Sequence, residues 1–445
     1  MTAADEPGPA TISRLTGRSL FSAWRAVMSV TVLGSITGFL ASTVAARSLG
    51  AEGFGIFAIA TNLLAILTLV ATAGYQMTIL RYGPKFLVEE DGASFRALVK
   101  SARTHTMTIA VIAMIVTVCG LIVFPRLSPT HRVDVMIVIV LALPFAIWSM
   151  MNTVINRVFG HLQLALLPDT VIRHIFVIGT GLIGYSTLAQ IGSDPRDYAV
   201  AILFACVASG ILTHKITERS TPDLVRRSAV GTVNHKWILT ALTFFGIDLL
   251  FLARTQIDVL VVAALVTTKE AGIYAIALRL GDVLYALTTT LSFALSPRIS
   301  EAMASSNRDV FLRDQKTAAL IMSAFGALIG APLILASGFW LSIFGPEFHA
   351  GASALIVITI ASMIRNFAGP YFYILTMTGH QNSATRLMAG AAITQLILLA
   401  ALTGPFGALG AAIARAVPDV LTSVMGWEIV RRRLGITIGL PALFR

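Results

Sequence analysis

Two segments of the chain, GIFAIATNL at residues 55–63 and GIYAIALRL at residues 272–280, share six of nine residues at an offset of 217 positions. Each opens an apolar run long enough to cross a membrane. An offset close to half of the 445 residues indicates two halves of related structure. Glycine and alanine recur in any membrane helix, so chance similarity is the alternative. The equal size of the two halves argues against it.

The rest of the chain has the composition of a membrane protein. Hydrophobic residues make up 56% and charged residues 12%, whereas soluble domains carry about 25% charged residues. Apolar runs of about 20 residues match the hydrocarbon thickness of about 30 Å. We therefore expect an all-α membrane protein with about twelve transmembrane helices, near residues 26–46, 54–80, 106–125, 133–155, 168–189, 197–214, 237–264, 272–295, 317–344, 352–378, 385–404 and 407–430.

The longest connection, residues 215–236, is basic and polar and lies near the middle of the chain. Six spans separate the two similar segments, so both cross the membrane in the same direction. The halves should then form a parallel repeat about an axis along the membrane normal, an arrangement known from transporters. The predicted order is a cytoplasmic N-terminal segment, a six-helix bundle, a cytoplasmic linker, a second six-helix bundle and a cytoplasmic tail, at 1–25, 26–214, 215–236, 237–430 and 431–445.

The net charge of +11 is distributed unevenly between the two sides of the predicted membrane domain. With a cytoplasmic N-terminus, 23 basic residues fall on the cytoplasmic side and five on the other. Such a bias follows the positive-inside rule, which explains the charge without a nucleic-acid partner. Both termini should therefore be cytoplasmic. The long polar segment before the first span argues against a cleaved signal peptide.

Several functional classes lack the residues they need. The two cysteines, Cys119 and Cys206, lie inside apolar runs, so neither a disulfide framework nor a zinc site is expected. The external connections are short and carry no paired carboxylates, clustered histidines or glycine-rich phosphate loop. We expect no enzyme activity, no catalytic residue, no metal and no cofactor.

Five arginines fall inside predicted spans, where a charge costs roughly 2.5–3.5 kcal/mol on insertion scales. They should face a bundle interior or a watery cavity. Arg365 has no acid within four residues, and Asn366 and Pro370 make its helix polar and kinked; its alternative partners are freed backbone carbonyls or Asp248. The five embedded arginines are Arg173, Arg254, Arg279, Arg365 and Arg415.

Acids one helical turn away offer a second interpretation, in which the arginines form ion pairs that only stabilise packing. The pairs of this kind are Asp169 with Arg173, Asp258 with Arg254, Asp282 with Arg279, and Asp419 with Arg415. The candidate acids for cavity lining or ion coupling are Asp258, Asp282, Asp248 and Asp419. An acid held by arginine usually stays ionised, which argues against proton exchange.

Short motifs along nearly the whole chain resemble those of bacterial polysaccharide flippases of the Wzx type, which belong to the multidrug/oligosaccharidyl-lipid/polysaccharide exporter superfamily. No single motif is specific, but their order and spacing are similar to the family's. The motifs are ARSLG at 46–50, GFGIF at 53–57, LRYGP at 80–84, AGIYA at 271–275, LSPRI at 295–299, FGPEF at 344–348, TGHQ at 378–381 and FGALGAAIA at 406–414.

This resemblance implies a MATE-like pair of bundles around a central cavity that opens alternately to each side. The implied substrate is a polyprenyl-pyrophosphate-linked oligosaccharide, moved across the bacterial inner membrane for O-antigen, capsule or exopolysaccharide synthesis. Arginine is well suited to phosphate, so we expect Arg365, Arg254, Arg279 and Arg415 to bind it. Arg47 and Arg81 would add charge at the rim. Membrane lipid and other polysaccharide assembly proteins are candidate partners, and a monomer is favoured.

Two other functions stay open. A multidrug or cation antiporter of the same superfamily would use an embedded acid in the N-terminal half, and the first four predicted spans contain none apart from Asp134 at the edge of the fourth. A membrane glycan polymerase or ligase would need a larger external loop. Most of the embedded arginines lie in the second half, whereas cationic cavities of saccharide flippases usually draw on both halves.

The charge bias predicts the topology. Reporter fusions near residues 95 and 225 should be cytoplasmic, and fusions near residues 130 and 195 should be external, because positive connections are retained on the cytoplasmic side. Paired alkaline phosphatase and fluorescent protein fusions measure this directly. A reversed pattern at any two of the four sites would contradict the prediction.

Overall fold

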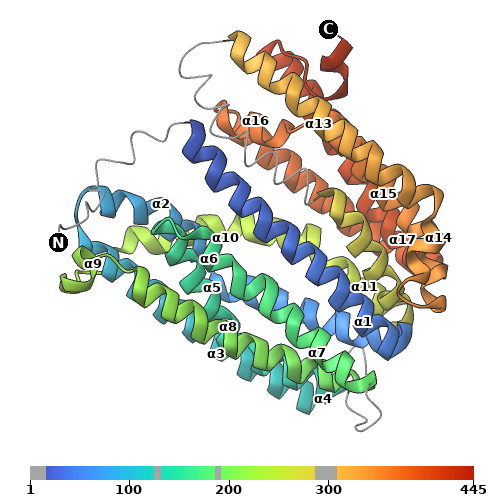
Figure 1. Cartoon of the computed structure of the whole chain (residues 1–445), viewed down its shortest axis with the longest axis horizontal. Helices are drawn as coiled ribbons and strands as arrows, with labels where there is room; N and C mark the ends of the chain where they lie inside the picture. Colours follow the sequence, from blue (N-terminus) through green and yellow to red (C-terminus); the bar gives the residue numbers. More distant parts are fainter. Residues whose placement is uncertain (1–16, 125–131, 186–191, 286–307, 445) are drawn as a thin grey trace, which may run out of the picture.

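The computed structural model describes residues 17–124, 132–185, 192–285 and 308–444. These residues form helices joined by short turns, and no β-strand occurs among them (Figure 1). Eight helical segments are long and apolar enough to cross a membrane. Two of them, Val32–Thr72 and Gln381–Leu434, are 41 and 54 residues long and so hold two spans each. With the helices at 162–185 and 268–285, twelve helical segments correspond to the predicted spans, and residues 286–295 of the predicted span 272–295 lie outside the described residues.

The first half of the chain is one bundle, drawn in blue to green in Figure 1. Its main contacts join α5 to α8, α1 to α7, α7 to α8 and α3 to α5. Its elements are α1 (Gly17–Thr72), α2 (Tyr75–Val88), α3 (Gly92–Val123), α4 (Val133–Leu141), α5 (Leu143–Val158), α6 (Leu162–Leu167), the π-helix η3 (Pro168–Ile172), α7 (Arg173–Tyr185), α8 (Pro195–Ser220) and α9 (Asp223–Arg227).

The second half is drawn in yellow-green to red. Within it, α17 packs on α15, α16, α11 and α10, and α13 packs on α15. Its elements are α10 (His235–Thr255), α11 (Ile257–Leu265), the helix at 268–285, α13 (Arg308–Leu335), α14 (Ser337–Ser342), the 3-10 helix η4 (Pro346–Gly351), α15 (Ala352–Ala368), α16 (Tyr371–Met377), α17 (Gln381–Leu434) and the 3-10 helix η5 (Leu440–Phe444).

Glycines turn the chain back at the ends of two spans. Gly50 interrupts α1 with a φ of 67°, and Gly407 interrupts α17 with a φ of 56°. A residue with a side chain rarely adopts this left-handed backbone, which explains the glycines. The helix that follows each turn begins with a backbone amide that has no acceptor within the helix. Glu347 accepts from Ala51 N–H at 3.0 Å, and Glu270 accepts from Ala408 N–H at 3.2 Å.

The two similar segments of the sequence meet where the halves touch. A Cβ placed on Gly55 would lie 1.9 Å from the carbonyl oxygen of Thr268, and a Cβ placed on Gly272 would lie 2.2 Å from that of Ala51. Thr268 and Gly272 follow Ala51 and Gly55 by the same 217 positions. Each segment thus contacts the other through equivalent residues, as expected for two elements related by a two-fold axis. The predicted parallel repeat is therefore confirmed.

Further contacts join the halves at both ends of the bundle pair. We call the side on which α9 lies and α17 ends the basic side, and the side of Gly50 and Gly407 the opposite side. On the opposite side the Arg47 Nε donates to the carbonyl of Ile343 at 2.7 Å, and the Phe39 and Phe344 rings lie 5.2 Å apart. On the basic side α10 packs on α2, where the hydroxyls of Tyr82 and Thr240 lie 3.2 Å apart.

The contact of the two glycines predicts how substitutions there behave. Gly55→Ala and Gly272→Ala should each destabilise the protein, because the added methyl collides with backbone, and overpacking costs about 1–3 kcal/mol. The matched controls are Gly120→Ala and Gly390→Ala, whose Cβ would meet nothing within 4 Å. They should be neutral or stabilising, since alanine favours helix over glycine. Thermal unfolding in detergent provides the comparison, and equal melting temperatures in all four variants would refute the close contact.

Candidate functional site

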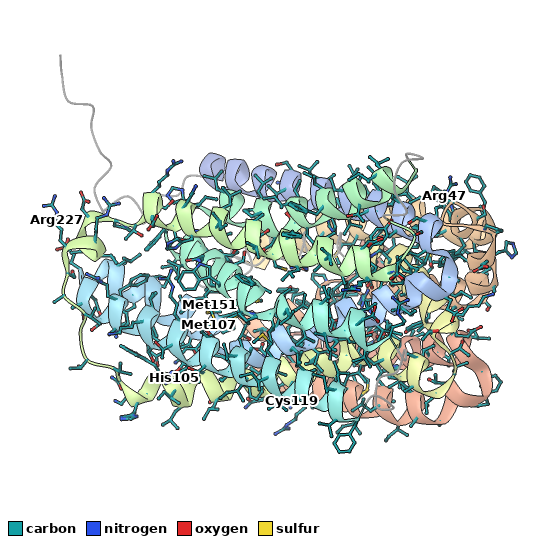
Figure 2. All side chains as sticks on the ribbon, turned by 90° about the horizontal axis from the view of Figure 1, so that it is seen from below. Arg47, His105, Met107, Cys119, Met151 and Arg227 are labelled. Atoms are coloured by element: carbon teal, nitrogen blue, oxygen red, sulfur yellow. The ribbon has the colours of Figure 1, made fainter. Side chains whose placement is uncertain are left out.

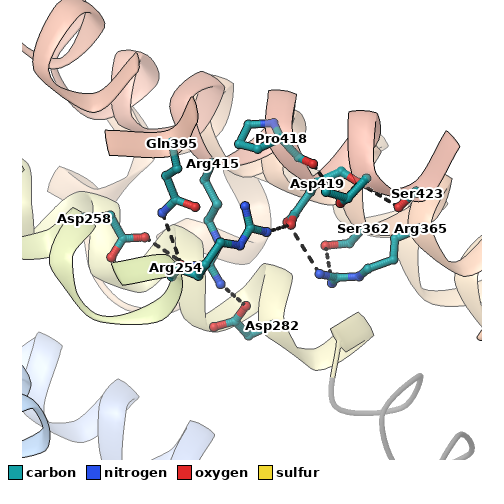
Figure 3. A network of polar contacts seen from close by, with 11 residues as sticks. Arg254, Asp258, Asp282, Ser362, Arg365, Gln395, Arg415, Pro418, Asp419 and Ser423 are labelled. Atoms are coloured by element: carbon teal, nitrogen blue, oxygen red, sulfur yellow. Dashed lines mark hydrogen bonds and ion pairs between the residues drawn. The ribbon is translucent and has the colours of Figure 1, made fainter. Parts of the chain in front are cut away.

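A network of charged side chains connects five helices of the second half (Figure 3). Arg254 comes from α10, Arg365 from α15, and Arg415 and Asp419 from α17. Asp258 begins α11, and Asp282 lies on the helix at 268–285. Such groups are rare inside membrane spans and require partners or water. Figure 3 shows that these charged side chains converge from the separate helices.

Asp419 binds two arginines at once. Its Oδ1 accepts a hydrogen bond from Arg254 Nη2, and its Oδ2 accepts one from Arg365 Nη1 at 3.4 Å. All three side chains are mostly buried, with exposed fractions of 16% for Arg254, 15% for Arg365 and 10% for Asp419. The Arg365 guanidinium also lies 4.4 Å from the centre of the Tyr285 ring, a cation–π contact.

Arg415 is held between two carboxylates. It donates to Asp258 Oδ2 at 2.9 Å and to Asp282 Oδ1 at 3.1 Å. Asp258 is fully buried and also accepts from the Tyr274 hydroxyl at 3.0 Å and from the Val259 amide at 2.9 Å. Asp282 is nearly half exposed. This cluster therefore has more negative than positive charge, and Asp258 is its fixed centre.

Arg279 reaches from the second half into the first. It donates to the Ser42 hydroxyl and to the Gly38 carbonyl, at 3.4 Å for the latter, both on α1. Its side chain is exposed although its neighbours Leu278 and Leu280 are buried. The cation thus lies in an accessible space between the halves.

The charge pairs differ from those expected along single helices. Arg254 and Asp258 are separated because α10 ends at Thr255 and α11 begins at Ile257, so both acquire partners on other helices. Arg415 and Asp419 share α17 but also bind other helices. Asp282 pairs with Arg415 in place of Arg279. The sequence therefore identified the charged residues, but their spacing along single helices did not predict which of them pair.

Arg173 and Asp169 also depart from the expected pair. Asp169 accepts from the hydroxyls of Ser149 at 2.8 Å and Thr153 at 3.3 Å. The intervening turn is the π-helix η3, Pro168–Ile172. Within the described residues, two hydroxyls of α5, and not Arg173, bind Asp169.

Arg365, which has no acid nearby in the sequence, is bound by Asp419 from another helix, a partner that the sequence analysis did not name. Asp248, its suggested partner, lies on α10 and forms no hydrogen bond or ion pair within the described ranges. Arg47 lies on the opposite side, bound to Ile343. Arg81 is exposed on α2, with Tyr82 as its ring neighbour. In the part of the chain that the structure describes, neither rim arginine contacts the network.

Three participants were not anticipated from the sequence. Gln395 on α17 donates to the backbone carbonyl of Arg254 at 3.2 Å, Tyr274 binds Asp258, and Tyr285 lies beneath Arg365. A glutamine in the middle of an apolar span was the available signal for Gln395. An apolar groove of about 450 Å³ between α6, η3 and α8 contains none of the network residues.

The network is balanced in charge but keeps unused donors. Three arginines, Arg254, Arg365 and Arg415, meet the three carboxylates Asp258, Asp282 and Asp419, and Arg279 adds a cation that binds α1. Arg254 Nη1 and Arg365 Nε are buried and have no hydrogen-bond partner among the described residues. Such donors can bind an anionic oxygen. Within the same residues no group of three metal-ligating side chains occurs.

The fold is that of a multi-pass membrane protein with two helical halves and charged side chains embedded among the helices. Solved structures with this fold include the lipid II flippase MurJ in an inward closed conformation, with a TM-score of 0.70 and 13% identity over 95% of this chain and 89% of that chain. An inward-facing multidrug resistance MATE family transporter of the MOP superfamily has a TM-score of 0.67 and 14% identity over 93% of this chain and 98% of that one.

A third structure is a MOP superfamily transporter from Pyrococcus furiosus, with a TM-score of 0.59 and 14% identity over 95% of this chain and 97% of that chain. No curated protein matches the chain in sequence. The family of polysaccharide biosynthesis proteins matches residues 21–303. The chain belongs to this family, and it has the fold of the MOP superfamily, as the sequence motifs predict.

The different surroundings of the two acids that bind Arg415 predict different effects. Asp258→Asn should destabilise the protein strongly, because removing one partner of a buried pair costs up to roughly 3–5 kcal/mol. Asp282→Asn should cost much less, since water reaches that carboxylate. Expression level and thermal unfolding in detergent measure both. An Asp258→Asn protein as stable as Asp282→Asn would disprove the central place of Asp258.

Proposed function

We propose that the protein is a flippase for a lipid-linked oligosaccharide, moving a polyprenyl-pyrophosphate carrier across the bacterial inner membrane. The observation that carries this proposal is a network of three arginines buried among membrane helices, in which two guanidinium donors have no partner among the described residues, with Arg279 as an accessible fourth cation between the halves. The substrate headgroup would enter this network while its apolar tail stays in the bilayer. We assign the transport to synthesis of a surface polysaccharide, whether O-antigen, capsule or exopolysaccharide.

The chemistry of the network fits a pyrophosphate. Each guanidinium is permanently charged and presents a planar set of donors that matches phosphate oxygens. Arg254 and Arg365 keep a buried donor free beside Asp419. Arg279 adds an accessible cation at the first half. Arg415 is already bound by two carboxylates, so we assign it to holding Asp258 and Asp282 in place.

Membership of the polysaccharide biosynthesis family and the fold shared with the lipid II flippase support the same proposal. Transport of this kind needs no bond to be made or broken, so we propose a transporter and not a polymerase or ligase. The protein would act with both termini in the cytoplasm, as a monomer beside other polysaccharide assembly proteins.

A MATE-type antiporter for drugs or cations is the second candidate, favoured only by the shared fold. Such a protein needs embedded acids to attract a cation. The three acids of the network are each bound to arginine, and two arginine donors stay free beside them. An anionic substrate is therefore the better match to the charge of the network.

The proposal predicts that Arg365→Ala inserts normally and loses polysaccharide export. Charged hydrogen bonds contribute about 1.5–3 kcal/mol each, so losing those to a headgroup should weaken binding roughly tenfold or more. Arg365→Lys should restore export in part, because it keeps the charge and loses the planar fork. The measurement is surface polysaccharide in a strain deleted for the gene, normalised to membrane protein level.

Arg386→Ala is the matched control, because Arg386 is an exposed arginine near the start of α17. It removes the same charge away from the network and should export normally. Wild-type export by a normally expressed Arg365→Ala protein would refute the assigned role. Loss of export in both variants would point to a general effect of arginine removal.

A further inference from the structure

Asp419 lies where an anionic headgroup would have to bind. It occupies the space between Arg254 on α10 and Arg365 on α15, and its two oxygens bind one arginine each. Resting on the proposed function, we propose that Asp419 is a resident counter-ion that the substrate pyrophosphate displaces and that returns when the substrate leaves. The carboxylate would thus act as an internal competitor of the substrate.

A carrier must pass through a state without substrate, and two buried arginines without an anion are costly in that state. Arg254 and Arg365 are each about five-sixths buried, so water screens them poorly. Asp419 supplies the missing charge from within the chain. The substrate-free protein can then change conformation without leaving both cations unpaired.

Asp419 and Asp258 differ in how firmly they are held. Asp258 is completely buried and bound by the Tyr274 hydroxyl and a backbone amide in addition to Arg415. The carboxylate oxygens of Asp419 accept only from the two arginines within the described structure, and the Arg365 contact is long at 3.4 Å. A group with no other partner can leave its arginines when a better anion arrives. Asp258 cannot do so without breaking several bonds.

The elements that carry the three groups allow such an exchange. Asp419 follows Pro418 on α17, whereas the arginines belong to α10 and α15. A pyrophosphate offers more oxygens than a carboxylate and can also use the free donors Arg254 Nη1 and Arg365 Nε. Binding of the headgroup would join α10 to α15 and free Asp419, while Arg415 keeps α17 bound to Asp258 and Asp282. Substrate binding would thereby change the contacts of α17 with α10 and α15.

The exchange predicts opposite changes in binding and transport for Asp419→Asn. The probe is a polyprenyl pyrophosphate without sugar, and its affinity for purified protein in lipid nanodiscs is measured directly. Without the competing charge the variant should bind roughly tenfold more tightly. Its transport should fall severalfold. Transport is measured in proteoliposomes as the rate at which a fluorescent polyprenyl-pyrophosphate lipid becomes inaccessible to a quencher. A purely structural role of Asp419 predicts weaker binding together with weaker transport, and that result would overturn the proposal.

Two matched variants separate the alternatives. Asp282→Asn removes one negative charge from the neighbouring pair and should tighten binding much less; an equal gain would mean that total charge matters and that no exchange occurs. Asp419→Glu keeps the competitor and should bind no more tightly than wild type. Unchanged binding in Arg365→Ala would instead contradict the proposed function, whatever Asp419→Asn does.

The wild-type protein offers a measurement that does not depend on any variant folding. Displacement releases the Asp419 carboxylate from two arginines, so binding of the probe should shift an aspartate carboxylate band in the infrared difference spectrum. Labelling aspartate with carbon-13 at the carboxyl group identifies the band. Binding of the probe without any such shift would show that Asp419 stays in place, and the exchange would be disproved.

Discussion

The interior of this protein depends on one constraint, the need of every embedded guanidinium for a partner. Within the described network each arginine binds a carboxylate, a hydroxyl or a carbonyl on another helix: Asp419 for Arg254 and Arg365, Asp258 and Asp282 for Arg415, and α1 for Arg279. Because these bonds cross between helices, the same charges that would bind a substrate also determine how the helices pack.

The scaffold is symmetric, whereas the charge is not. Gly55 and Gly272 contact each other reciprocally, and the turn at Gly50 corresponds to the break near Thr267. At the same offset, however, Arg279 and Asp282 correspond to Asn62 and Ala65. The repeat thus gives two similar bundles, of which only the second carries these charged residues. The asymmetry explains why nearly all network residues come from the second half.

The two clusters of the network, around Asp258 and around Asp419, suit two different roles that the sequence does not distinguish. Around Asp258 the partners are numerous and buried, which suits a fixed support. Around Asp419 they are few, and donors remain free beside it, which suits an exchangeable site. Both clusters share α17, so a change at Asp419 reaches Arg415 through one turn of helix. Figure 2 shows the whole molecule, in which Arg47 and Arg227 lie at opposite ends.

The sequence by itself determined the membrane spans, the two-fold repeat and the presence of cations that need an interior position. These features follow from local composition and periodicity, which each segment carries alone. Only the tertiary structure decided which acid meets which arginine. The break at Gln256 separates Arg254 from Asp258, and Asp169 binds hydroxyls of α5 in place of Arg173. Asp419 and Arg365 are 54 residues apart, and their contact depends on how α15 and α17 pack, which spacing along the chain does not encode.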